Sequence, residues 1–125
     1  MNELDREDMK ILVVDDEEEI GLIVSMILRK RGHICETANR LKLGEEKLIA
    51  HRYDMLFLDV NLPDGVGLDF ISIAHKLQPN LKICVISAYD SGGEPERALH
   101  LGASNFLKKP FSKQEIIETV AQIQD

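Results

Sequence analysis

The sequence predicts a single α/β domain in which a five-stranded parallel sheet is covered by five helices on its two faces. Short apolar runs alternate with longer segments whose apolar residues recur at helical spacing, and this alternation is typical of parallel βαβ units. Several of the apolar runs end directly in polar residues, which indicates strands that leave a buried sheet. At 125 residues the chain has the length of one domain, and no repeat or interior linker divides it.

The expected elements follow one another in strict alternation. Buried strands are predicted at residues 11–14, 34–38, 53–58, 81–86 and 103–107. Helices are predicted at 17–31, 41–50 and 68–77, in a short segment that ends at 101, and at 112–123, where Ser112 and Glu115 have capping-box spacing. Residues 1–8 are expected to form a flexible N-terminal tail before a domain that spans 9–125.

The first helix has the clearest amphipathic pattern. Its apolar stripe, at positions spaced by three or four residues, is expected to face the core and consists of Ile20, Ile23, Val24, Ile27 and Leu28. Leu22 and Met26 lie off this stripe and are expected to be exposed.

Composition excludes several classes of function. A net charge of -7 argues against general binding to nucleic acids or anionic membranes, which are themselves polyanions. No apolar run approaches the ~20 residues of a membrane span, so we expect a cytoplasmic protein. Cys35 and Cys84 fall in predicted core strands and are expected to be buried free thiols, since no second Cys or His lies at metal-ligand spacing.

Polar side chains follow four of the predicted strands. Asp15 and Asp16 follow the first, Asp59 the third, Ser87 the fourth and Lys109 the fifth. Because functional groups collect outside the carboxyl ends of strands in an open parallel sheet, we expect them to meet at one edge. Each alone has an ordinary explanation, such as a helix cap, a turn residue or a surface charge, but their recurrence at successive strand ends favours a common site.

Three carboxylates at close range repel one another unless a cation is present. An all-oxygen site suits Mg²⁺, and also Mn²⁺, and the carbonyl of Asn61 could complete the ligand set. With Lys109 and the Ser87 hydroxyl nearby, such a site could position a phosphoryl group, with Asp59 as the nucleophile.

These residues lie in segments that resemble the receiver domain of two-component response regulators, of the chemotaxis-regulator type. The matching segments, in order along the chain, are ILVVDD (11–16), LDVNLPDGVG (58–67), ISAY (86–89) and LGASNFLKKPF (101–111). The match covers the chain from about Met9 to Ile123.

The resemblance implies a doubly wound, flavodoxin-like sheet of order 2-1-3-4-5 and a phosphoryl transfer to Asp59 from a histidine kinase or a phosphotransfer protein. It implies Mg²⁺ held by Asp16, Asp59 and the Asn61 carbonyl, with Asp15 acting partly through water. Ser87 and Phe106 would form the switch pair, and a cis bond to Pro110 would orient Lys109.

The resemblance also implies a bacterial signalling switch that assists its own phosphorylation and dephosphorylation and is otherwise not an enzyme. Its partners would be the phosphodonor and a downstream effector or output domain, without direct nucleic-acid or membrane binding. A phosphorylation-dependent dimer through the fourth helix, fifth strand and fifth helix is one assembly that it allows. We further expect exposed Leu22 and Met26 to form part of the phosphodonor docking surface.

The chain departs from the family pattern at a few positions. Leu41 and Glu45 stand where the family usually has Gly and a core Leu, so the second helix is expected to pack differently. Phe106 replaces the more common Tyr. Three other classes of function are a phosphate-free interaction module, a metal-dependent phosphatase and a flavin carrier. The phosphatase would need a general acid where this chain has Asn61. The flavin carrier would need a phosphate-binding loop after the first strand, where this chain has acids.

Overall fold

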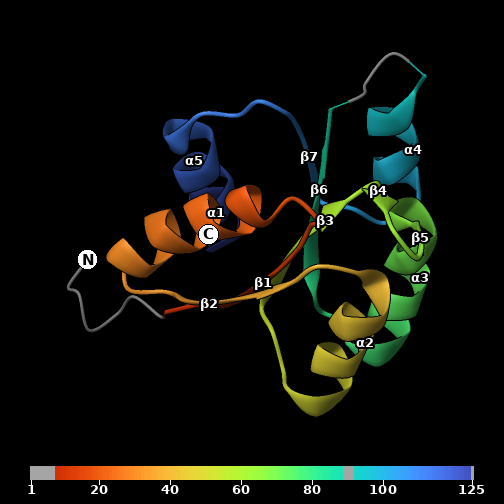
Figure 1. Ribbon diagram of the computed structural model, residues 1–125, viewed down its shortest axis with the longest axis horizontal. Coiled ribbons are helices and arrows are strands. Elements are labelled where there is room, and N and C mark those ends of the chain that lie inside the picture. The colour runs from red at the N-terminus through yellow and green to blue at the C-terminus, as the bar shows by residue number, and fades with distance from the viewer. Residues whose placement is uncertain (1–7, 89–91, 125) are drawn as a thin grey trace.

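The structure, a computed structural model, describes residues 8–88 and 92–124. Five strands form a parallel sheet in the order β2-β1-β3-β6-β7 (Figure 1). Because β6 and β7 are the fourth and fifth strands of this sheet along the chain, this is the predicted doubly wound order 2-1-3-4-5. Their bounds are β1 Lys10–Val14, β2 Ile34–Ala38, β3 Met55–Asp59, β6 Lys82–Ser87 and β7 Asn105–Lys108. Of the predicted tail only Asp8 lies among the described residues, where it is exposed, and Tyr89 of the fourth matching segment lies outside them.

Five helices cover the two faces of the sheet. They are α1 Glu18–Lys30, α2 Leu41–Ala50, α3 Gly67–Leu77, α4 Glu94–His100 and α5 Lys113–Gln124. Helices α1 and α5 lie on one face, and α2, α3 and α4 on the other (Figure 1). Alternate residues of the central strands point to opposite faces, so Leu12 and Val14 join one core while Ile11 and Val13 join the other.

Two features differ from the expected elements. Asn61–Leu62 and Gly65–Val66 pair as a short antiparallel hairpin, β4–β5, between β3 and α3, where a plain loop was predicted. In α1 the prediction for Ile23 was wrong, because its side chain is 51% exposed and the buried positions are Gly21, Val24, Ser25 and Leu28. The small residues Gly21 and Ser25 carry the buried face instead, with the methyl group of Thr37 only 3.1 Å from where a Gly21 Cβ would lie.

Helix α2 packs on the sheet through a glycine. A Cβ added to Gly44 would lie 2.9 Å from Cγ2 of Val14, so the absence of a side chain lets the helix approach β1 closely. Leu41 and Glu45, the two departures from the family pattern, are both half-buried.

Two other local predictions are confirmed, while the strands predicted to begin at residues 53 and 103 begin two residues later, at Met55 and Asn105. Ser112 and Glu115 form the capping box, with the Glu115 N–H donating to Ser112 Oγ at 3.1 Å and the Ser112 N–H to Glu115 Oε1 at 2.8 Å. Cys35 and Cys84 are buried free thiols. None of the helices within 8–88 and 92–124 combines the length and apolar character that crossing a membrane requires.

Candidate phosphoryl and metal site

The carboxyl edge of the sheet brings the predicted acids together. Val14 pairs with Leu58 and Asp59 with Ile86 in the parallel ladders, so the ends of β1, β3 and β6 lie side by side. Asp15 directly follows β1, and Asp59 is the last residue of β3. The strand register alone therefore places these two carboxylates on neighbouring strands at the same height.

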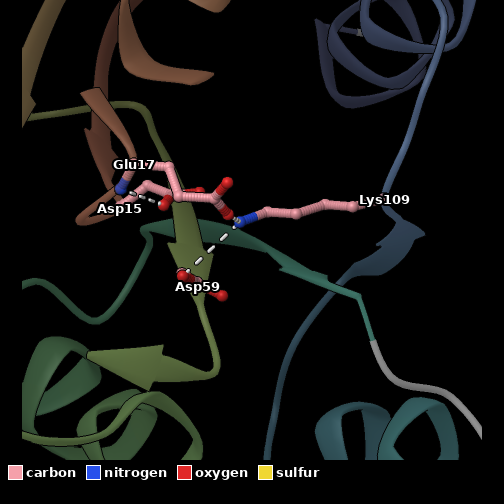
Figure 2. Close-up of polar contacts among 4 residues, drawn as sticks. All are labelled: Asp15, Glu17, Asp59 and Lys109. Carbon is pink, nitrogen blue, oxygen red and sulfur yellow. Dashed lines mark hydrogen bonds and ion pairs between the residues drawn. The ribbon is translucent and has the colours of Figure 1, made fainter. Parts of the chain in front are cut away.

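Lys109 reaches this edge from the segment after β7. Its ammonium nitrogen lies 2.8 Å from Asp15 Oδ2, 2.7 Å from Glu17 Oε1 and 3.5 Å from Asp59 Oδ2 (Figure 2). The backbone N–H of Lys109 also donates to the carbonyl of Ser87 at 2.8 Å, which ties this segment to the end of β6. One cation is thus held among three carboxylates.

Asp59 is strongly affected by its surroundings. Only 6% of its surface is exposed, and burial is the main reason that its pKa rises from 3.8 to about 6, with the neighbouring charge of Asp15 as the second. The ammonium of Lys109 and a hydrogen bond from the Asn61 backbone N–H act in the opposite direction. The carboxylate of Asp59 is therefore short of positive charge, even with Lys109 present.

Lys109 responds in the complementary way. Burial alone would lower the pKa of this lysine, but its contacts with Asp15, Glu17 and Asp59 raise the pKa above the usual range. Lys109 is therefore a fixed positive charge at neutral pH. Its partners differ in environment, because the side chain of Asp15 is fully buried whereas that of Glu17 is 61% exposed.

The carboxylates fit a divalent cation. Asp15, Glu17 and Asp59 each offer a carboxylate oxygen within 4.8 Å of the others. Within residues 8–88 and 92–124, these three form the cluster of acidic side chains that could hold a metal ion. Lys109 Nζ is the charged partner of the buried Asp15 Oδ2, which accepts no hydrogen bond of good geometry. An excess of buried negative charge with spare acceptor capacity is what a hard cation such as Mg²⁺ would satisfy.

Asp16 and Asn61 lie beside this cluster. Asp16 is exposed and does not belong to the group of three carboxylates, so its part in metal binding stays a prediction. Asn61 begins β4 and is exposed, and its backbone N–H is the group that bonds to Asp59. Whether its carbonyl is a ligand also stays a prediction.

The predicted switch residues lie on adjacent strands. Ser87 ends β6 and is buried, and Phe106 lies half-buried in β7 against the core that contains α4. Val85 is the ladder partner of Phe106, two residues before Ser87. The peptide bond between Lys109 and Pro110 is cis.

Leu22 and Met26 project from α1 and are 59% and 51% exposed. Leu22 also lines a groove of about 600 Å³ that runs beside α1 and includes Asp15 and Ser25. Exposed apolar side chains therefore lie on the helix that adjoins the acidic site, and Ile23, which was predicted to be core, is exposed on the same helix.

Sequence reasoning missed Glu17 as a site residue. It follows Asp15-Asp16 directly and is the first of three consecutive glutamates, so its residue type does not distinguish it from Glu18 or Glu19. Its N–H donates to Asp15 Oδ1 at 2.9 Å, which turns the chain into α1 and directs its side chain to Lys109. The signal that could have identified it is its position, at the turn between the first strand and the first helix.

Comparison with known proteins gives a consistent result. A family model described as the response regulator receiver domain matches residues 11–121. The chain is 33% identical over 112 residues to the response regulator protein PilR of Pseudomonas aeruginosa, and 31% identical over 110 residues to the transcriptional regulatory protein BasR of Escherichia coli. These matches cover 90% and 86% of this chain but only 25% and 49% of those proteins, so the chain spans a quarter to a half of the length of these relatives.

Solved structures agree with the sequence relatives. A CheY-like receiver domain protein of Methanospirillum hungatei superimposes with a TM-score of 0.89 at 28% identity, over 95% of each chain. The beryllofluoride-activated NtrC4 receiver domain, solved as a dimer, gives a TM-score of 0.87 at 35% identity, over 91% of this chain and 94% of that one. With the family model spanning nearly the whole fold, this chain belongs to the response regulator receiver domain family.

Proposed function

We propose that this domain accepts a phosphoryl group on Asp59 from a histidine kinase or a histidine phosphotransfer protein and signals through the resulting change of its surface. The observation that carries this proposal is the contact of one ammonium group with the carboxylates at the ends of two neighbouring strands. Such a cation is suited to neutralise a phosphoryl group that becomes attached to Asp59.

In the transfer, a carboxylate oxygen of Asp59 would attack phosphorus while the bond from phosphorus to the donor imidazole nitrogen breaks. The electron pair of that bond leaves with the imidazole, which then takes a proton from water, and an acyl phosphate is formed. Lys109 would hold a phosphoryl oxygen by an ion pair, and the hydroxyl of Ser87 would donate a hydrogen bond to another.

A divalent cation, for which Mg²⁺ is the preferred candidate and Mn²⁺ the alternative, would supply neutralisation of the acids and of the phosphoryl oxygens. Asp15, Asp16, Asp59 and the Asn61 carbonyl are the proposed ligands, and Glu17 is close enough to contribute. The pKa of Asp59, raised mainly by burial and then by Asp15, supports this assignment because a bound cation would favour the ionised carboxylate against both effects.

The output would depend on Ser87 and Phe106. Movement of the Ser87 hydroxyl toward the phosphoryl group would allow Phe106 to turn inward and alter the surface of α4, β7 and α5. Partners would read that surface, and a phosphorylation-dependent dimer could use it; the NtrC4 receiver domain is a dimer in its beryllofluoride-activated form.

The experiment is intact mass spectrometry after incubation with acetyl phosphate, with and without Mg²⁺. Wild type is expected to gain one phosphoryl group only with the metal, and Asp59→Asn to gain none. Asp69→Asn, which changes an exposed acid in α3, is the matched control and is expected to behave as wild type. A wild-type protein that forms no adduct, or an adduct that persists in Asp59→Asn, would contradict the proposal.

The docking proposal for Leu22 and Met26 has its own test. Replacing both by Ala is expected to slow transfer from the cognate kinase but not from acetyl phosphate, because the small donor does not need a docking surface. Ile49→Ala, at an exposed position of α2, is the control. An unchanged rate from the kinase would exclude these two residues from the docking surface.

A further inference from the structure

Helix α2 is capped by a residue from the loop that follows the phosphoacceptor strand. Asp64 lies between β4 and β5, and its carboxylate accepts hydrogen bonds from the first two N–H groups of the helix. Oδ1 lies 2.8 Å from the Leu41 nitrogen and Oδ2 lies 2.9 Å from that of Lys42. These hydrogen bonds bridge 23 and 22 residues of sequence, so they connect two separate parts of the fold.

The helix has no local substitute for this cap. Its N-cap residue, Arg40, has the extended backbone of a normal N-cap but makes no side-chain capping bond, and the first turn contains no acid. The two hydrogen bonds, from Lys42 and then Leu41, hold the pKa of Asp64 below its usual range, with Arg40 assisting. The free N–H groups of Leu41 and Lys42 at the start of α2 therefore find their hydrogen-bond acceptor in the hairpin, and the carboxylate also interacts favourably with the helix dipole.

The hairpin is held firmly at both of its ends. At its tip, a Cβ on Gly65 would lie 2.9 Å from Cδ1 of Leu41, so the tip lies directly against α2. At its base, a Cβ on Gly67 would lie 1.9 Å from the carbonyl oxygen of Asp59, and the Gly67 N–H donates to the Val60 carbonyl at 2.6 Å. The hairpin therefore contacts the acceptor strand at its base and α2 at its tip, so it provides a direct route between them.

The β4–β5 hairpin joins Asp59 to α2, partly through hydrogen bonds and partly through its own chain. The Asn61 N–H bonds to the Asp59 carboxylate, Asn61 pairs with Val66 across the hairpin, and Asp64 at the tip bonds to the helix. We propose that Asp64 couples the chemical state of Asp59 to the first turn of α2, so that this turn responds when the acceptor is loaded. The inference rests on the proposed function, because it requires that Asp59 be modified.

The physical reason is the change in the acceptor. Conversion of the Asp59 carboxylate to an acyl phosphate makes one carboxyl oxygen a bridging oxygen and moves the negative charge to the phosphoryl oxygens. The hydrogen bond from Asn61, which the carboxylate charge strengthens, must therefore change in strength or direction. Because coupling is reciprocal, loss of the Asp64 contact would in turn loosen the Asn61 segment around the acceptor. Asp64 touches no reacting atom and is a positioning residue.

The test is amide NMR of the full chain with Mg²⁺ and beryllium fluoride, which stands in for the phosphoryl group. In wild type the Leu41 and Lys42 amide resonances are expected to move on addition. In Asp64→Ala combined with Arg40→Ser they are expected to stay in place, because the introduced serine hydroxyl provides a local cap that keeps α2 folded without contact to the hairpin. Arg40→Ser alone is the matched control and is expected to retain the movement.

The outcomes separate this proposal from the function on which it rests. If resonances near Ser87 and Lys109 move but those of Leu41 and Lys42 do not, or if the double variant still responds at α2, the coupling is overturned while the acceptor assignment stands. If no resonance moves and acetyl phosphate forms no adduct, the acceptor assignment fails. Should the double variant lose α2, Asp64→Asn keeps the shape of the side chain and is expected to weaken the movement; an undiminished movement in that variant would overturn the coupling.

Discussion

Replacing Asp59 by Asn is expected to stabilise the metal-free domain at neutral pH, although it removes the proposed acceptor. The Asp59 carboxylate is buried and faces Asp15, and Lys109 compensates only part of the cost of its charge. An amide of the same shape carries no charge and can still accept the hydrogen bond from Asn61. The variant therefore tests whether the charge of Asp59 lowers the free energy of unfolding of the metal-free domain.

The magnitude follows from the pKa of Asp59. The rise from 3.8 to about 6, at about 1.4 kcal/mol per pH unit, corresponds to about 3 kcal/mol of unfolding free energy. Because the folded-state pKa is the higher one, the wild type has the full benefit of a neutral Asp59 below pH about 4 and loses it as pH rises through about 6. The advantage of Asp59→Asn should therefore appear over that interval and be constant above it.

The assay is urea unfolding of both proteins in EDTA, at about pH 4 and at about pH 7.5. The control is Asp64→Asn, for which the sign is opposite: its hydrogen bonds lower the pKa, so Asp64 stabilises the fold above its unfolded pKa and loses that contribution as the pH falls. Adding Mg²⁺ should reduce the advantage of Asp59→Asn, because the cation stabilises the wild type. Equal or lower stability of Asp59→Asn at neutral pH in EDTA would refute the reasoning.

Three further predictions concern stability and reactivity. Lys109→Ala should lower the metal-free stability by about 3 kcal/mol at neutral pH, measured by urea unfolding, because buried carboxylates lose their cation; no loss would contradict the ion-pair geometry. Gly67→Ala should lower the free energy of unfolding by at least about 3 kcal/mol, because its Cβ would overlap backbone atoms. Gly93→Ala should lower it by about 1 kcal/mol in the same assay, because Gly93 has open space around it but a φ of +82°. Similar losses for the two variants would contradict this reasoning. Cys35 and Cys84, whose pKa values burial raises to about 11 and about 12, should not react with a thiol reagent until the protein unfolds, and rapid labelling of the native state would show that they are accessible.

Most of the sheet could be predicted because its signals are local. Each central strand is a short apolar run, and the residues at its carboxyl end share one edge through the topology of parallel βαβ units. Asp15, Asp59 and Lys109 came together for that reason, without knowledge of any side-chain contact. The capping box at Ser112 was equally local, because both partners lie within one turn.

The features that escaped prediction depend on contacts between distant segments. Asp64 reads as a turn residue, and only the folded chain brings it to the start of α2. Glu17 was indistinguishable from its neighbours until the turn after β1 directed it to Lys109. Ile23 has the residue type and spacing of a core position, but the helix rotates so that Gly21 and Ser25 face β2, where small side chains permit a close approach.

The two closest acidic partners of Lys109 differ in their exposure to water, so ionic strength affects the two ion pairs to different extents. Salt screens the contact with Glu17, which is open to water, far more than the contact with Asp15, which is enclosed. In dilute buffer the ammonium is shared between them, whereas near physiological salt it is held chiefly by the enclosed acid beside Asp59. If the proposed function holds, phosphorylation rates compared across buffers are expected to include a salt effect that originates in this one lysine.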